Sequence, residues 1–180
     1  MAQEDLGMKI DFKFKGVLRV QQKIGRIPRY MRIAAHDSVG ETLKRAKDKA
    51  QEYCPKKYGN LRSSNYIIWS GGSYTGVSKE DNPDFVNNPD DKRASISRLS
   101  AGHQAAISRE MGRVKRAGSV VGIIGYSAYY ADFVHEVEFD HYTTPGTGSK
   151  YLQRAINETF PELPTVLLKR ARSALIGAMR

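Results

Sequence analysis

The order of apolar and polar residues divides the chain into strand-like and helix-like segments. Residues 8–15 alternate strictly between apolar and charged side chains, which predicts a strand with one buried face. From about residue 24 to residue 53, apolar side chains recur every three to five positions and form one stripe of a long amphipathic helix. We expect Pro28 in the first turn of this helix, and Pro55 lies just beyond its end. The chain therefore begins with a strand followed by a long helix.

The remainder of the chain mixes both patterns. A turn over residues 58–64 leads into an apolar strand over 65–70, and residues 71–95 read as a polar loop. The further elements are predicted in this order: a helix with apolar residues from 96 to 111, a buried strand over 119–125, an alternating strand over 131–142, a short helix over 150–159 and a last helix that begins at Pro164.

This order of elements predicts an α+β fold, in which a small, mainly antiparallel sheet packs against the long N-terminal helix. C-terminal helices and a loop-plus-helix insertion complete it. We expect residues 1–180 to form a single domain, with 71–118 as an insertion or arm and 160–180 as a C-terminal helical extension. The apolar stripe on the helix of the insertion is expected to face a neighbouring subunit, because a stripe on a peripheral segment needs a partner surface.

Composition adds a basic character. The chain has 29 Lys and Arg residues against 19 Asp and Glu residues, and the net charge of +10 favours a polyanion or an acidic surface as a partner. The longest uncharged run, residues 117–131, is shorter than the ~20 residues that span a bilayer. The first residues lack the basic and apolar regions of a signal peptide. We therefore expect a soluble intracellular chain without a membrane partner.

Much of the charge lies on the long helix, where residues 21–53 hold 8 basic and 4 acidic side chains. Two interpretations are open: these side chains form the solvated faces of helices, or they contact the phosphates of DNA. The candidates for contact with DNA are Arg26, Arg29, Arg32, Lys44, Arg45, Arg113, Lys115 and Arg116.

The sequence offers few candidates for catalysis. His135 and His141 flank several carboxylates, but a zinc protease needs two His four positions apart on one helix. On a strand, His residues six positions apart would be about 20 Å from each other, too far to share an ion. We interpret this segment as the charged face of an exposed strand, expect no metal or cofactor, and keep a metal-dependent hydrolase as the weaker alternative.

Two other features have structural interpretations. Cys54 is the only cysteine, which excludes a disulfide framework, and we expect it to be a small residue near the core rather than a nucleophile. The segment from Gly122 to Gly125 is similar to the GXXG loop of RNA-binding KH modules, but it lies in an apolar run without basic neighbours. Glycines inside such a strand indicate a bulge or a close approach of the backbone. We therefore expect no enzymatic activity.

Four short motifs follow one another along the chain. They are the alternating segment MKIDFKFKG at 8–16, the segment YGNLRSS at 58–64 that follows a helix and a proline, YADFVHE at 130–136, and GSKYLQRA at 148–155. In these motifs the chain resembles the neck and tail-completion proteins of tailed bacteriophages, which are also known as head–tail joining or minor capsid proteins. The resemblance covers about 8–70 and 119–159. The motif residues after the first segment are Gly59, Asn60, Leu61, Arg62, Tyr130, Ala131, His135, Glu136, Lys150, Tyr151 and Leu152.

The chain also departs from the family pattern. Tyr58 stands where the family has Thr, which removes a hydroxyl that could cap the turn. Residues 71–118 are longer than the usual connection, and 160–180 match nothing in the family, so the resemblance assigns no role to either segment.

The resemblance implies a structural protein of the virion neck, which is assembled in the host cytoplasm. It would form a homo-oligomeric ring of six subunits, with twelve as the alternative. The partners would be the adaptor or portal-side proteins on one side and tail terminator proteins on the other, with genome DNA in the lumen. A basic, sequence-independent nucleic-acid-binding module is the alternative function.

The motif residues suggest structural roles. Gly59 would supply a turn with positive φ, and Asn60 would cap that turn through its side chain. Leu61 and Leu152 would anchor their segments in the core. Arg62 could pair with a carboxylate, for which Glu136 is a candidate, either within one chain or between subunits.

Overall fold

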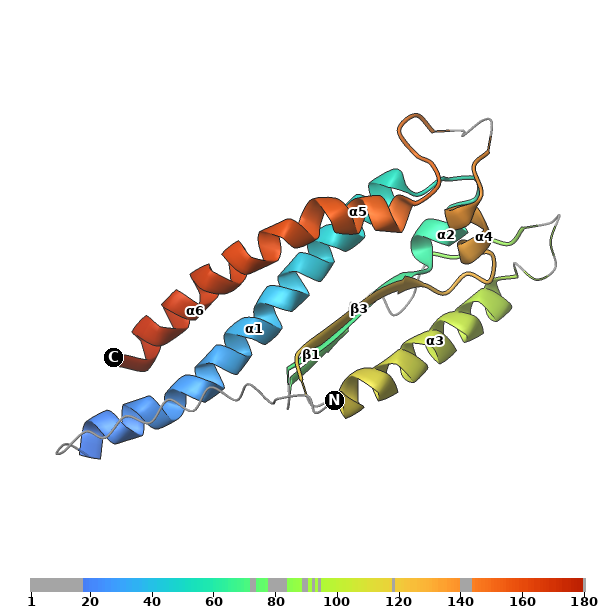
Figure 1. Ribbon diagram of the computed structural model, residues 1–180. Helices are drawn as coiled ribbons and strands as arrows, with labels where there is room; N and C mark the ends of the chain where they lie inside the picture. Colours follow the sequence, from blue (N-terminus) through green and yellow to red (C-terminus); the bar gives the residue numbers. More distant parts are fainter. Residues whose placement is uncertain are drawn as a thin grey trace, which may run out of the picture.

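Figure 1 shows the computed structural model of the chain. The structure describes residues 18–71, 74–77, 84–88, 91, 93, 95–117, 119–139 and 144–179, so the strand expected over 8–15 and His141 lie outside the described residues. In chain order the elements are α1 (Leu18–Tyr53), α2 (Asn60–Ser63), β1 (Asn65–Gly71), β2 (Tyr74–Val77), α3 (Ile96–Arg116), β3 (Val121–Tyr126), α4 (Ala131–Glu136), α5 (Tyr151–Thr159), a 3-10 turn (Phe160–Glu162) and α6 (Leu163–Met179).

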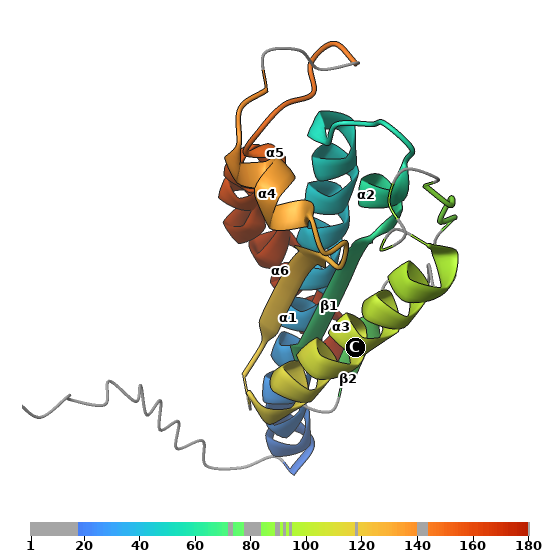
Figure 2. The ribbon, with the colours of Figure 1, turned by 90° about the vertical axis from the view of Figure 1, so that its right-hand side faces the viewer.

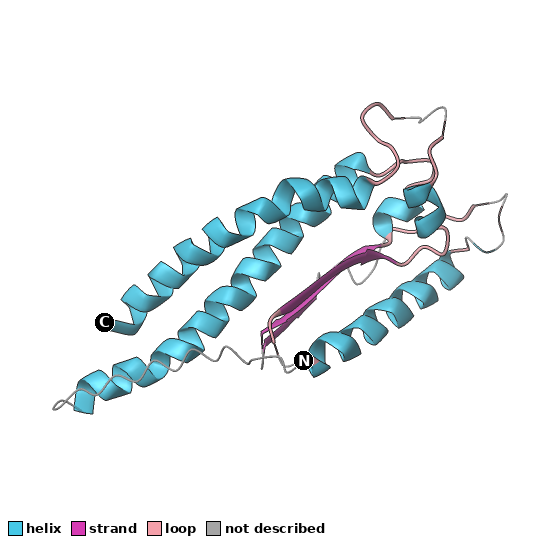
Figure 3. Ribbon diagram, in the orientation of Figure 1, coloured by secondary structure: helices cyan, strands magenta, loops and turns pink. Residues whose placement is uncertain are grey.

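The elements stack in layers. Helix α1 covers one face of a three-stranded sheet, and α3 covers the other face (Figures 1 and 3). Helices α5 and α6 pack on the side of α1 that faces away from the sheet. The prediction of an α+β fold, with a small sheet against a long N-terminal helix, is confirmed. None of the described helices has both the length and the apolar character that a membrane span requires.

The sheet is antiparallel throughout and has the strand order β2-β1-β3. Strand β1 is central, so its side chains alternate between the layer of α1 and the layer of α3. Ile67 pairs with Ile124 and Ile68 pairs with Ile123, and both β1 isoleucines are fully buried. A strand that is buried on both faces reads as a continuous apolar run, as residues 66–69 do.

Two glycines allow α1 to lie close to the sheet. A Cβ on Gly40 of α1 would lie 2.6 Å from the Trp69 ring on β1. A Cβ on Gly122 of β3 would lie 2.7 Å from the side chains of Val39 and Leu43 on α1. Both distances are shorter than van der Waals contact, so neither position has room for a side chain. The prediction that the glycines of this strand mark a close approach of the backbone is confirmed.

Helix α3 belongs to the core of its own subunit. Its buried Ile107 and Val114 pack with Tyr66 and Ile68 on the second face of the sheet. The expectation that this stripe faces a neighbouring subunit is therefore wrong. The sheet itself supplies the partner surface that the stripe requires. Residues 71–118 thus contribute both a strand, β2, and a layer of the fold.

Strand β2 occupies part of the expected polar loop, because the segment after β1 turns back to form a hairpin. Thr75 and Gly76 pair with Ser70 and Trp69 of β1. The four residues are too few and too polar to produce a clear period of two, so the sequence pattern does not predict the strand.

The alternating strand expected over 131–142 is wrong, because residues 131–136 form helix α4. The Val134 N–H donates to the Tyr130 carbonyl at 3.1 Å, and the Val137 N–H donates to the Phe133 carbonyl at 3.0 Å. Ala131 and Val134 are three positions apart and face the core, whereas Phe133 is 60% exposed. An i, i+3 pair satisfies a helix as well as the alternation satisfies a strand, and burial decides between them.

Helix α1 begins earlier than expected, at Leu18, so Pro28 lies inside the helix and not in its first turn. Proline removes one backbone hydrogen bond and crowds the carbonyl four positions earlier. Accordingly, α1 changes direction within its N-terminal part in Figure 1.

The close packing at Gly122 can be tested by a single methyl group. We expect Gly122→Ala to lower the free energy of unfolding by about 1–3 kcal/mol, because the new Cβ would displace Leu43, which is 1% exposed. Gly102→Ala is the matched control, because a Cβ on this exposed residue of α3 meets nothing within 4 Å. The control should raise the free energy of unfolding by about 0.5–1 kcal/mol through helix propensity. Urea denaturation measures both, and equal stability of the two variants would contradict the close packing.

Candidate functional site

The motif segments meet at one end of the molecule, where α1 ends and α2, α4 and the first turn of α5 gather (Figure 2). Their side chains form one apolar cluster, which we call the motif cluster. Its buried members are Cys54, Leu61, Ala128, Ala131 and Tyr151, and Tyr53, Tyr126, Tyr130, Val134 and Leu152 pack against them. The predicted core positions of Leu61 and Leu152 are thus confirmed, and segments about 90 positions apart in sequence lie in contact.

Tyr151 is the centre of the motif cluster and is 1% exposed. Its hydroxyl donates to the Ala131 carbonyl at 3.2 Å, which ties α5 to α4. Its ring makes edge-to-face contacts with Tyr126 and His135, each with ring centroids 5.0 Å apart. Burial raises the pKa of the Tyr151 hydroxyl, so this group remains a neutral hydrogen-bond donor.

Lys150, His135 and Glu136 fasten the start of α5 to the end of α4. The Lys150 N–H donates to the His135 carbonyl at 2.8 Å, and its ammonium group contacts the carboxylate of Glu136. The backbone of Lys150 has a φ of 54°, a left-handed conformation that is uncommon for a residue with a side chain. The Lys150 ammonium group and then His135 hold the pKa of Glu136 below its usual value. These residues therefore have structural partners within the subunit.

Arg62 does not pair with Glu136 within the subunit, contrary to the intrachain form of the prediction. Its Nε donates to the Cys54 carbonyl at 2.9 Å, just beyond the last turn of α1. The carbonyl end of a helix carries partial negative charge, which a guanidinium group neutralises. Arg62 therefore caps the end of α1, while Glu136 binds Lys150 and His135.

The turn before α2 has one expected and one unexpected feature. Gly59 has a φ of 88°, which confirms the predicted positive φ. Asn60 does not cap this turn through its side chain, because its amide pairs with the backbone of Val86. Asn60 Nδ2 donates to the Val86 carbonyl and the Val86 N–H donates to Asn60 Oδ1, both at 2.7 Å. The side chain thereby holds residues 84–88 against α2, as a neighbouring strand would.

Cys54 is fully buried in the motif cluster, as expected of a small core residue. Burial raises the pKa of its thiol to about 12, and the nearby Arg62 opposes this rise only in part. Few thiolates exist at neutral pH under these conditions. In the described part of the chain, no three His, Cys, Asp or Glu side chains are grouped closely enough to hold a metal ion.

An aromatic pocket of about 480 Å³ opens on the surface of this end. Tyr129, Phe133 and Phe139 line it and are 49%, 60% and 39% exposed. The rings of Phe133 and Phe139 lie 5.9 Å apart, and the Tyr129 hydroxyl donates to Asp91 on the rim. Exposed aromatic side chains that gather around a cavity are typical of contacts with another protein.

Sequence reasoning missed this pocket. On a strand, Phe133 and Phe139 would share a buried face, whereas helix α4 turns Phe133 towards solvent. The signal available in the sequence is the density of aromatic residues between 126 and 142, which predicts packing but not its direction.

The structure separates the candidates for contact with DNA. Arg29, Arg32, Lys44 and Arg45 lie on α1, whereas Arg113, Lys115 and Arg116 lie at the C-terminal end of α3, across the sheet. All of these side chains are exposed, and for Arg26 only the backbone is described. Arg113 pairs with the buried Glu110 at 3.0 Å, and Lys44 lies 5.7 Å from the centre of the Trp69 ring. The eight candidates therefore do not form one patch.

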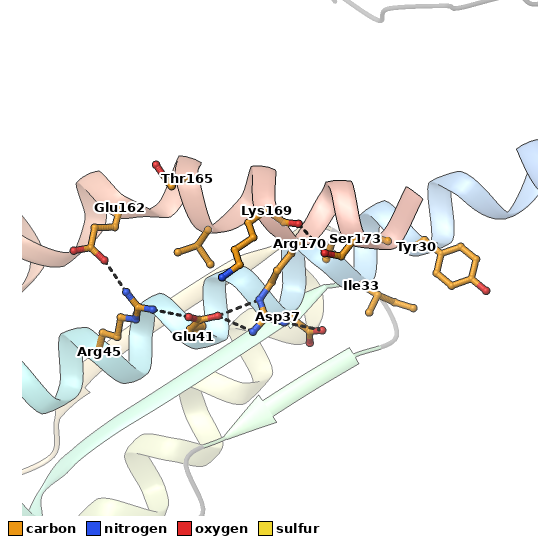
Figure 4. A pocket seen from close by; sticks show the side chains of 13 residues that line it. Tyr30, Ile33, Asp37, Glu41, Arg45, Glu162, Thr165, Lys169, Arg170 and Ser173 are labelled. Atoms are coloured by element: carbon orange, nitrogen blue, oxygen red, sulfur yellow. Dashed lines mark hydrogen bonds and ion pairs between the residues drawn. The ribbon is translucent and has the colours of Figure 1, made fainter. Parts of the chain in front are cut away.

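Arg45 belongs to a ladder of ion pairs between α1 and α6 (Figure 4). It binds Glu41 and Glu162, each at 2.7 Å, and Glu41 also binds Arg170 at 2.6 Å. The Arg170 guanidinium, followed by Arg45, holds the pKa of Glu41 below its usual value. These pairs line a groove of about 610 Å³ between the two helices. The charges in this groove hold the C-terminal helix on α1 and are not free for a ligand.

The burial of Cys54 predicts a slow reaction with thiol reagents. At pH 8 the native protein should react with an aromatic disulfide about a thousandfold more slowly than an exposed thiol, because about three pKa units separate the buried thiol from an ordinary one. Ser119→Cys, at an exposed position, provides the exposed thiol in the same protein. Rapid modification of Cys54 in the native protein, followed by absorbance, would contradict the packing of the motif cluster.

Comparisons of the chain with models of protein families, with curated proteins and with solved structures find no significant match.

Proposed function

We propose that this chain is a structural protein of the bacteriophage neck, which joins the portal-adaptor complex to the tail as a symmetric ring. The observation that carries the proposal is the motif cluster: the motif segments at 58–64, 130–136 and 148–155 pack against one another at one end of the subunit. In this proposal the protein has no enzymatic activity and needs no cofactor. The ring has six subunits, with twelve as the alternative.

The interactions of the motif residues support a structural role. Tyr151, Asn60 and Arg62 each direct a polar group to a backbone carbonyl of another segment. Such bonds fix the relative positions of loops and helix ends rather than offering a reactive group to a substrate. The exposed side of the same end carries the aromatic pocket, where a rigid surface can bind a subunit or a neck protein. A ring arises when one such surface binds a different surface of the next copy and the rotation closes.

The ring is tested by native mass spectrometry and electron microscopy of the full chain. We expect a closed assembly of six copies, and Phe133→Ser should weaken it, because this 60% exposed ring offers apolar surface to a neighbour. Leu168→Ser, at a 71% exposed position on α6 away from the motif cluster, is the matched control and should leave the assembly intact.

The place in the virion is tested by complementation. Phage particles that lack this protein should accumulate as separate filled heads and tails, and added purified protein should join them. Complete infectious particles assembled without the protein would overturn the proposal.

A second candidate function, binding of DNA without sequence preference, is supported by a specific set of charges. Arg29, Arg32, Lys115 and Arg116 are exposed and form no ion pair with the described residues. Residues 18–36 of α1 hold five basic and no acidic side chains. Phosphate contacts made by such groups are sensitive to salt and indifferent to base sequence.

DNA binding is measured by fluorescence anisotropy over a range of salt concentrations. We expect equal affinity for unrelated duplexes, and the double variant Arg29→Gln/Arg32→Gln should reduce the slope of log affinity against log salt by about 2. Lys49→Gln is the control, because Lys49 already pairs with Glu52 at 2.8 Å and should contribute little. A strong preference for one duplex, or an equal effect of the control, would contradict this function.

A further inference from the structure

Strand β3 has an edge that no described strand covers. It pairs with β1 on one side, and no other described strand pairs with it. Its side chains are mostly half-buried and Gly122 is exposed, whereas Ile67 and Ile68 in the neighbouring β1 are fully buried. The outer N–H and C=O groups of β3 are therefore available for pairing with another strand.

This edge has none of the features by which proteins protect an open strand. Residues 121–126 contain no charged residue and no proline, and they lie inside the uncharged run 117–131. Open edges usually carry lysine, proline or a charge that faces inward, because an unprotected apolar edge pairs with other chains. The composition of β3 therefore indicates a strand that is covered in the working state of the protein.

The chain contains a segment suited to cover it. Residues 8–15 lie outside the described residues, and their sequence predicts a strand with Met8, Ile10, Phe12 and Phe14 on one face. Lysines or an aspartate occupy every position of the opposite face. Added to β3, this segment would place its apolar side chains beside an apolar strand and present charges to solvent. It would supply the protection that β3 lacks.

The length of α1 prevents residues 8–15 from reaching β3 of the same subunit. Gly122 lies against Val39, which is 21 residues, or about 31 Å, along the helix from Leu18. Lys15 precedes Leu18 by three residues, so it stays within about 10 Å of the start of the helix. It therefore remains about 20 Å short of the first residues of β3. Met8, at about 34 Å from Leu18 when fully extended, only reaches that level.

The rest of β3 lies still farther away, because Tyr126 packs in the motif cluster beside Cys54, beyond the last turn of α1. Only a segment that enters from outside the subunit can lie along the whole strand.

We propose that residues 8–15 of one copy of the chain pair with the open edge of β3 in a second copy. The contact joins subunits by exchanging a strand, so each copy gives one arm and receives another. Backbone hydrogen bonds supply affinity, and the alternation of the arm selects the face that meets the core of the receiving subunit. The inference does not depend on the assignment to the phage neck, because it holds for any assembly of this chain.

The exchange is tested with two copies of the full chain expressed together. One copy carries a photoreactive benzoylphenylalanine in place of Phe12, and the other carries an affinity tag. After irradiation we expect a product that contains both chains, with mass spectrometry locating the bond within residues 119–128 of the tagged copy. Crosslinks within one chain only, or crosslinks between chains at any other segment, would overturn the proposal.

Substitutions in the arm show whether its apolar face makes the contact. Ile10→Gln together with Phe14→Gln should reduce the yield of the crosslink between chains at least tenfold. Lys9→Gln together with Lys13→Gln, on the opposite face, is the matched control and should change the yield less than twofold. Both pairs should leave the thermal unfolding of the subunit core unchanged. An equal loss in both pairs, or no loss in either, would contradict pairing through the apolar face.

Discussion

The close packing of α1 against β1 and β3 is the interaction on which the other layers depend. Gly40 and Gly122 remove the side chains that would otherwise separate the helix from the sheet. The backbones can then approach, and Val39 and Leu43 fill the space that remains. Helix α6 in turn packs on the far side of α1, so its position follows from that of α1. A shift of α1 would change the layers on both of its sides, because protein interiors are close-packed.

The end of α1 also organises the motif cluster. The chain leaves the helix at Cys54, and Arg62 returns to bind the carbonyl of that residue. From there α2, α4 and α5 surround Tyr151, whose hydroxyl and ring contact three different segments. The polar groups of the motif are thus used within the subunit. What this end offers to other molecules is the aromatic surface of the pocket formed by Tyr129, Phe133 and Phe139.

Charge has two different roles in this protein. Along the groove between α1 and α6, Arg45 and Arg170 are neutralised by carboxylates and hold two helices together. Exposed ion pairs of this kind contribute little individually, but several that share partners also fix the register of the helices. Arg29, Arg32, Lys115 and Arg116 are left facing solvent. The net charge of +10 therefore overstates the basic surface that a polyanion meets.

The sequence by itself determined α1, α3, α5 and α6 and the strands β1 and β3, because the periods of their apolar residues are local. It also indicated the close approach at Gly122 and the core positions of Leu61 and Leu152. Only the tertiary structure decided that residues 131–136 are helical, since their pattern satisfies both periods and burial against the motif cluster chooses one. The exposure of Phe133 follows from that choice. The neutralisation of Arg45 also needed the structure, because one of its partners, Glu162, lies 117 positions away in the sequence. Local patterns specify which elements form, whereas the side chains that meet across layers depend on how the chain returns upon itself.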